Sequence, residues 1–157
     1  MARERMSRGD LLLLIAVLAA FGVVDAAYLT YQWYEAAAHT WCDIDPFWSC
    51  TAVRTSVYAS IGGVVPTALI GVAGFAIIVV LAVLALRGFE KVGPWTVGRW
   101  LLAFAVLGGL IGVGLTLVEI FVIQAVCILC VLGFALDLGI LGVAVLAGRA
   151  GEPDAAG

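Results

Sequence analysis

The chain has 157 residues, of which 64% are hydrophobic and only 12% are charged, whereas soluble domains average about 25% charged residues. A chain of this length forms one domain at most. Its formal net charge is -3 and it has no basic patch, so neither a soluble domain nor a nucleic-acid partner is expected.

Four hydrophobic segments are long enough to cross a bilayer. They cover residues 11–34, 64–86, 97–123 and 127–146, and about 20 apolar residues span a hydrocarbon core of about 30 Å. The first segment is too long for a cleavable signal peptide, so we expect it to be retained. The sequence therefore predicts a single all-α domain, an integral membrane four-helix bundle, with a loop over 35–63 and a disordered tail over 148–157.

The basic residues predict the orientation of these spans, because cytoplasmic segments carry an excess of Lys and Arg. Only Arg54 falls on the side of the long loop. The other seven fall on the opposite side: Arg3, Arg5, Arg8, Arg87, Lys91, Arg99 and Arg149. We therefore expect both termini in the cytoplasm, and the loop 35–63 on the extracytoplasmic face of the plasma (inner) membrane.

The four cysteines form two pairs that this topology brings to one membrane face. Cys42 and Cys50 lie in the long loop, and Cys127 and Cys130 form a C-x-x-C at the start of the last span. Free cysteine is often only a small buried hydrophobe, but four of them at one face argue against that. The extracytoplasmic compartment of a bacterium is oxidising, so disulfides persist there.

The long loop carries signs of a surface structure. The acids and Pro46 between Cys42 and Cys50 favour a turn, and a disulfide between the two cysteines would close a small ring. Further on, Val53, Val57 and Tyr58 predict a short interfacial helix within 51–60. Such a helix would cap the bundle and cover a cavity.

The C-x-x-C lies at the outer end of a predicted helix. Free backbone N–H groups and the positive end of the helix dipole stabilise a thiolate there, and a thiolate is the attacking species in disulfide exchange. A spacing of three residues puts Cys127 and Cys130 on one helix face.

Several segments of the chain, taken in order, resemble one family. They are residues 28–31 (Tyr-Leu-Thr-Tyr), the pair Cys42 and Cys50, Ser56 with Tyr58 and Ala59, residues 66–71 (Pro-Thr-Ala-Leu-Ile-Gly), and residues 119–123 (Glu-Ile-Phe-Val-Ile) leading into Cys127 and Cys130. The pattern resembles the bacterial branch of the vitamin K epoxide reductase family of membrane thiol oxidoreductases, over about residues 10–146. Disulfide-bond-formation proteins of the B type carry their C-x-x-C in the first outer loop instead.

This resemblance implies a disulfide-forming electron relay. A separate reduced thioredoxin-fold protein would react with Cys42, Cys50 would exchange with Cys127, and Cys130 would lie beside a quinone, either menaquinone or ubiquinone. The partner is expected to be separate because the chain ends just after its fourth span.

Two positions depart from the family pattern. Thr67 and Phe134 stand where well-known members have an Asn and a Tyr that are thought to bond the quinone oxygens. Phe134 has no hydrogen-bond donor, and Thr67 has a shorter reach. Epoxide reduction needs proton donors at defined positions. The two departures therefore argue more strongly against epoxide reduction than against quinone reduction.

Other polar residues and functions stay open at this stage. Asp25 and Glu119 lie near the outer ends of their spans and are expected either to reach water or to pair by hydrogen bonds. Asp137 is expected to be a helix-packing group, and His39 is expected to be an exposed loop residue. The alternatives to the relay are a four-cysteine metal site, or a membrane scaffold with structural disulfides.

Overall fold

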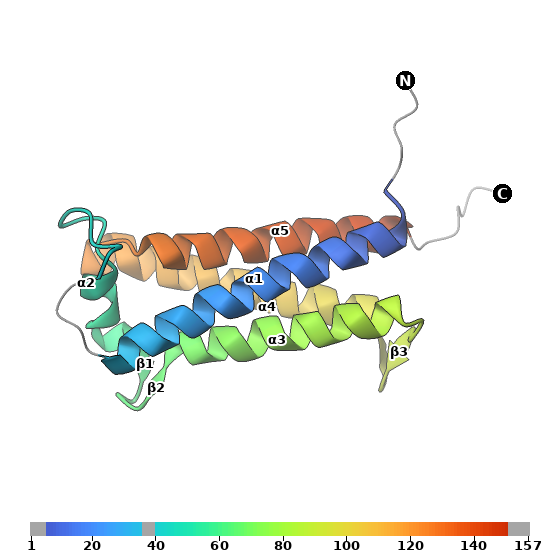
Figure 1. Cartoon of the computed structure of the whole chain (residues 1–157), viewed down its shortest axis with the longest axis horizontal. Helices are drawn as coiled ribbons and strands as arrows, with labels where there is room; N and C mark the ends of the chain where they lie inside the picture. Colours follow the sequence, from blue (N-terminus) through green and yellow to red (C-terminus); the bar gives the residue numbers. More distant parts are fainter. Residues whose placement is uncertain (1–5, 36–39, 151–157) are drawn as a thin grey trace, which may run out of the picture.

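The computed structural model describes residues 6–35 and 40–150. Within these ranges, four long helices run side by side along the molecule (Figure 1): α1 Arg8–Glu35, α3 Thr67–Leu86, α4 Val97–Val118 and α5 Ile128–Ala150. Helix α4 continues into a π turn, η2, at Glu119–Ile123. All four are long and apolar enough to cross a membrane, which confirms the predicted all-α bundle.

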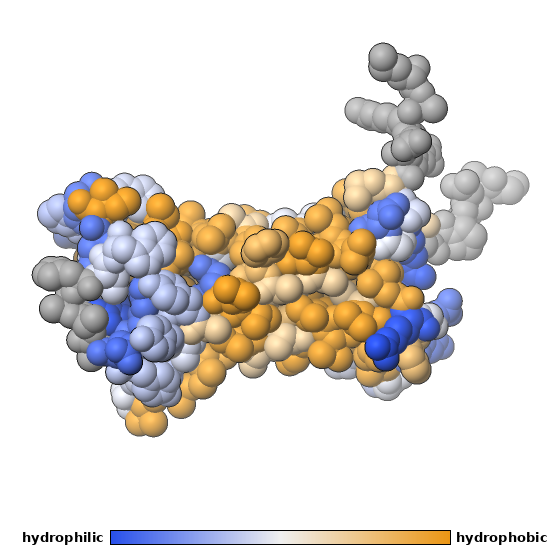
Figure 2. Space-filling view, in the orientation of Figure 1, coloured by the Kyte–Doolittle hydropathy of each residue, from blue (hydrophilic) through white to orange (hydrophobic). Residues whose placement is uncertain are grey.

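The two ends of the bundle differ. One end carries α2 (Cys50–Arg54) and the hairpin of β1 (Ser60–Ile61) and β2 (Val65–Pro66). The other end carries the hairpin of β3 (Lys91–Val92) and β4 (Trp95–Thr96), together with the start of α1 and the end of α5 (Figure 1). Figure 2 shows hydrophobic side chains over the middle of the molecule and hydrophilic side chains gathered at both ends. A belt of this kind is what a lipid bilayer requires of the surface that faces it.

Three of the long helices have bounds other than those predicted. Helix α1 covers Arg8–Glu35 rather than 11–34. Helix α3 begins at Thr67 rather than 64, because β1 (Ser60–Ile61) pairs with β2 (Val65–Pro66) across a turn in which Gly62 and Gly63 have positive φ. Helix α5 continues to Ala150, three residues into the predicted tail, since a single Gly148 costs only about 1 kcal/mol in a helix. Residues 151–157 lie outside the described part.

The loop between the first two long helices contains the expected short helix, in two pieces. They are α2 (Cys50–Arg54) and the 3-10 turn η1 (Val57–Ala59). The hydroxyls of Thr55 and Ser56 donate to the carbonyls of Thr51 and Val53, at 2.9 and 2.7 Å. Such side-chain bonds compete with helix continuation, and they separate the two pieces.

Small residues let the long helices approach closely. The tightest core lies toward the end opposite α2 and includes Ile15, Ala19, Ile78, Ala82, Leu101, Ala105 and Ile140. Gly22 leaves space for the ring of Phe75, and Gly112 leaves space for the ring of Phe134. Small residues serve this purpose in membrane bundles generally. The second contact fixes Phe134 between α4 and α5, near the C-x-x-C.

Candidate functional site

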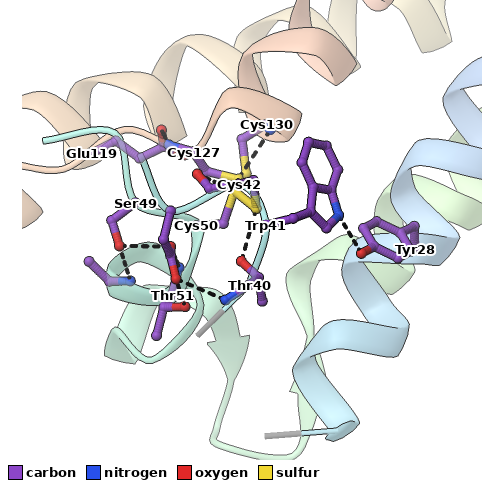
Figure 3. Close-up of a disulfide and its surroundings, with 12 residues drawn as sticks. Tyr28, Thr40, Trp41, Cys42, Ser49, Cys50, Thr51, Glu119, Cys127 and Cys130 are labelled. Atoms are coloured by element: carbon purple, nitrogen blue, oxygen red, sulfur yellow. Dashed lines mark hydrogen bonds between the residues drawn. A yellow bond between two sulfur atoms is a disulfide. The ribbon is translucent and has the colours of Figure 1, made fainter. Parts of the chain in front are cut away.

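The loop pair is a disulfide, Cys42–Cys50. Both residues are almost fully buried, at 1% and 2% exposure. The Thr40 hydroxyl lies 3.1 Å from the Cys42 sulfur, and the indole N–H of Trp41 donates to the Tyr28 hydroxyl of α1 at 2.6 Å. The disulfide is therefore covered by its own loop, which is attached to α1 (Figure 3).

Asp43 organises the loop around this disulfide. Its carboxylate accepts the backbone N–H of Thr40 at 3.0 Å and of Thr51 at 2.9 Å, and the hydroxyls of Ser49 and Thr51 at 3.0 and 2.6 Å. Desolvation raises the pKa of Asp43, but these bonds outweigh it and hold the pKa well below its usual range. This role of Asp43 was not predicted from the sequence, although an acid beside a cysteine among Ser and Thr residues was a usable signal.

The loop reaches the C-x-x-C through backbone pairing. The Ser49 N–H donates to the Val126 carbonyl at 3.1 Å, and the Val126 N–H donates to the Phe47 carbonyl at 2.6 Å. Since Cys50 follows Ser49 and Cys127 follows Val126, the pairing places these two cysteines together. A contact between segments so far apart in sequence carries no local signal.

The π turn η2 shapes the other side of this pairing. Its carbonyl at Glu119 accepts the N–H groups of Gln124 and Ala125, and Gln124 adopts a left-handed conformation with φ of 58°. The Glu119 side chain, only 4% exposed, accepts the Cys127 N–H at 3.2 Å. Of the two possibilities that the sequence left for Glu119, contact with water or a hydrogen bond, the structure has the hydrogen bond, and the side chain is buried against the C-x-x-C.

Cys127 immediately precedes α5 and has the environment of an attacking thiol. The backbone N–H of Cys130 donates to its sulfur at 3.4 Å. A hydrogen bond from the Cys130 thiol lowers the pKa of Cys127 most, and backbone N–H groups lower it further, against an opposing desolvation. The predicted stabilisation of a thiolate at this helix end thus has a geometric basis.

The two cysteine pairs meet at one point. The Cys127 sulfur lies 3.2 Å from the Cys50 sulfur, which is itself bonded to Cys42 (Figure 3). Cys130 lies one helical turn farther along α5 and is half-buried. A thiolate at Cys127 is therefore placed to attack Cys50 and to release Cys42, which is the chemistry of disulfide exchange.

A cavity of about 600 Å³ opens beneath the cysteines, between the long helices. This volume is within the range of about 300–1,000 Å³ typical of small-molecule sites. Its wall is mainly apolar, and it includes the three residues predicted to contact a cofactor: Thr67, Cys130 and Phe134. The ring of Phe134 lies against Gly112, and the Thr67 hydroxyl donates to the Tyr58 carbonyl at 3.1 Å.

Two buried acids also border this cavity. Asp25 and Asp137 are 8% and 6% exposed. One oxygen of each, Oδ1 of Asp25 and Oδ2 of Asp137, is buried without a hydrogen-bond partner among the described residues. Asp137 lies against Gly108 and Gly109 at the deep end, consistent with a packing role. Oδ1 of Asp25 neither reaches water nor has a hydrogen-bond partner in the described part of the chain, the two possibilities that the sequence left open.

The apolar walls fit a flat, mostly apolar ring, and a protonated carboxyl group at the wall could donate a hydrogen bond to an oxygen on that ring. A quinone has this character. His39 lies outside the described residues. Within residues 6–35 and 40–150, no group of three or more His, Cys, Asp or Glu side chains could hold a metal ion. The alternative of a four-cysteine metal site has no support in this arrangement.

A family model described as the vitamin K epoxide reductase family matches residues 13–145, nearly the whole chain. No individually curated protein matches the chain.

Proposed function

The chain belongs to the vitamin K epoxide reductase family, and we propose that it forms disulfides in a separate protein and passes the electrons to a membrane quinone. Membership confirms the resemblance drawn from the cysteine pattern. It makes the protein a multi-pass membrane redox enzyme that works through cysteine thiols. Beyond family membership, we propose the kind of partner, the order of electron transfer and the quinone as electron acceptor.

The close approach of Cys127 to the loop disulfide carries the proposal. A reduced thioredoxin-fold protein reduces the loop pair at Cys42. Cys50 then attacks the C-x-x-C disulfide at Cys127, forming Cys50–Cys127 and releasing Cys130 as a thiolate. Attack of Cys42 on Cys50 releases Cys127 and restores the loop disulfide. The arrangement described here, an oxidised loop pair 3.2 Å from a free Cys127, corresponds to the end of this exchange.

The cavity beneath Cys130 supports the second half of the relay. A bound quinone accepts the two electrons that the C-x-x-C thiols lose when they form a disulfide. Cys130, Thr67 and Phe134 line the space in which its ring would lie. Thr67 already donates its hydroxyl to Tyr58, and Phe134 has no donor, so these two residues would hold the ring by shape. Quinone reduction therefore suits the site better than epoxide reduction.

The partner must displace the loop to react with Cys42. That cysteine is only 1% exposed, while its neighbour Trp41 is exposed on the outer surface. Once the loop disulfide is reduced, the pairing of Phe47 and Ser49 with Val126 still holds Cys50 near Cys127. We propose that the partner acts at the extracytoplasmic face of the plasma (inner) membrane, where the long loop lies.

A Cys42→Ala variant tests the order of the relay. Cys50 then lacks its loop partner and should remain attached to Cys127, so that mass spectrometry finds a Cys50–Cys127 crosslink. Cys130 is left as a thiolate facing the cavity, and with quinone bound it should produce a visible charge-transfer absorption. Adding Cys130→Ala should remove that absorption, because no thiolate then faces the cavity.

The same experiment has clear contrary outcomes. A Cys50–Cys130 crosslink would mean that the roles of the two C-x-x-C cysteines are reversed. If the wild-type protein, supplied with a reduced thioredoxin-fold protein, leaves short-chain menaquinone and ubiquinone unreduced, the proposed activity is wrong.

A further inference from the structure

Asp25 is a buried acid for which the relay has so far given no role. It lies in α1 and borders the same cavity as Cys130 and Phe134. Its side chain is 8% exposed, and its Oδ1 is buried with no hydrogen-bond partner in the described part of the chain. Buried polar atoms are nearly always paired, so an unpaired one at the wall of a ligand cavity indicates a contact that the ligand supplies.

The contact between α1 and α5 places this carboxyl close to the level of the cysteines. A Cβ added at Gly133 would lie 3.0 Å from Oδ2 of Asp25. Gly133 follows Cys130 by three residues, a rise of about 4.5 Å along a helix. The carboxyl therefore lies within one helical turn of Cys130, and a ring resting on the Cys130 sulfur would come within its reach.

The surroundings favour the neutral acid. A charged carboxylate inside a membrane bundle is costly unless it is paired. The other ionisable residues that border the cavity are Arg54, Tyr58, Glu119, Asp137 and three cysteines, Cys50, Cys127 and Cys130. Arg54 donates instead to the Gln32 carbonyl at 2.6 Å, and Glu119 is bonded to Cys127. A neutral carboxylic acid has one O–H to donate.

We propose that Asp25 donates a hydrogen bond, and then its proton, to an oxygen of the bound quinone, an inference that rests on the proposed function. It supplies the donor that Phe134 lacks and that Thr67 has committed to Tyr58. Oxidation of the two C-x-x-C thiols to a disulfide releases two electrons and two protons, and reduction of a quinone to a quinol consumes the same number. Asp25 gives one proton to the quinone, and one of the two protons released by the thiols restores the acid. The other proton released by the thiols becomes the second proton of the quinol.

Two substitutions separate hydrogen bonding from proton transfer. Asp25→Asn keeps an N–H donor but has no acidic proton, so quinone affinity should stay within about threefold while the rate of quinol formation falls about a hundredfold, within the range of general acids. Asp25→Leu removes the donor, so affinity should fall about tenfold. Affinity is measured with short-chain menaquinone through quenching of tryptophan fluorescence, since Trp33 borders the cavity.

Asp137→Asn is the matched control. Asp137 is equally buried and also has an unpaired oxygen, but it follows Cys130 by seven residues, about 10 Å deeper along α5. Infrared difference spectra give a readout independent of turnover. Binding of menaquinone should shift a protonated-carboxyl band that is absent in Asp25→Asn and retained in Asp137→Asn.

The outcomes distinguish this inference from the relay. Adding Cys42→Ala to each Asp25 variant should still give the Cys50–Cys127 crosslink, which shows a folded protein with intact exchange. If Asp25→Leu binds menaquinone as wild type does, or the band is lost in Asp137→Asn instead, Asp25 is not the donor. If the wild-type protein reduces no quinone, the proposed function fails and the role of Asp25 fails with it.

Discussion

Asp43 is the residue on which the shape of the cysteine loop most depends. Its carboxylate joins Thr40, before the loop disulfide, to Ser49 and Thr51, beside Cys50. The pKa of Asp43 lies below its ordinary value of 3.8 because these hydrogen bonds outweigh desolvation. A carboxylate with a lowered folded-state pKa stabilises the fold fully above its unfolded pKa, and the stabilisation is lost as pH falls through the folded value.

We expect Asp43→Ala to expose the loop disulfide. A phosphine reductant should cleave Cys42–Cys50 several-fold faster in this variant, and the difference from wild type should persist from neutral pH down to about pH 4. Asp43→Asn retains one acceptor oxygen and should be intermediate. Reduction of Asp43→Ala at the wild-type rate would show that the carboxylate does not hold the loop closed.

Phe134→Tyr restores a hydroxyl at a position that lacks one. Because Phe134 borders the cavity beside Cys130, the added donor should leave quinone reduction intact and should leave affinity unchanged or raise it by up to about tenfold, the effect of one hydrogen bond. Titration of short-chain menaquinone measures this. A folded variant without activity would show that the ring does not lie where we place it.

At the residue scale, the sequence alone indicated the candidate redox cysteines but not the contacts of the residues around them. The C-x-x-C at a helix start has a recognisable spacing, so a stabilised thiolate at Cys127 was predictable. The burial of Cys42 and the contact of Glu119 with Cys127 were not. The first depends on the loop, which pairs with Val126 although the two segments are remote in sequence. The second depends on the π turn η2, which turns the Glu119 side chain toward Cys127.

At the scale of elements, the contact between α4 and α5 controls the shape of the cavity. The ring of Phe134 fits against Gly112, where any Cβ would collide with it. Gly114 lies on the same helix, and a Cβ there would meet nothing within 4 Å. The two glycines therefore differ in their contacts, although they share a helix and a residue type.

Substituting each glycine by alanine tests this contact. Gly112→Ala should displace the Phe134 ring and weaken quinone binding about tenfold, because overpacking in a tight contact costs about 1–3 kcal/mol. Gly114→Ala should leave the affinity unchanged, since it changes helix propensity by a similar amount without a collision. Equal affinities in both variants, measured by fluorescence quenching, would mean that Phe134 does not shape the site.

Most helices were predictable because membrane spans depend on length and composition alone. Exceptions occur where side chains or turns interrupt a helix. Thr55 and Ser56 divide the interfacial helix, and because of the turn at Gly62 and Gly63, α3 begins only at Thr67. The π turn η2 was not predicted either, because it lies within a continuous apolar segment whose composition matches an ordinary helix.

At the scale of the whole molecule, most basic residues lie at the opposite end of the bundle from the cysteines. The elements that carry Arg8, Arg87, Lys91, Arg99 and Arg149 meet at the end with β3–β4, and the end with α2 carries Arg54 and the four cysteines (Figure 1). A bundle inserted according to the positive-inside rule would present its cysteines to the oxidising compartment. The orientation in the membrane therefore determines whether the relay can receive electrons from outside.

Reporter and labelling experiments in whole cells test this orientation. A reporter fused after Gly157 should be active in the cytoplasm, because seven of the eight basic residues favour that side. After mild reduction, an impermeant thiol reagent should label Cys42 from outside, slowly at first because the loop covers it. In a variant without native cysteines, Glu90→Cys, in the exposed turn before β3, should be labelled only after the cells are opened. Labelling of Glu90→Cys in intact cells would reverse the orientation, and the relay would then have to draw its electrons from the cytoplasm.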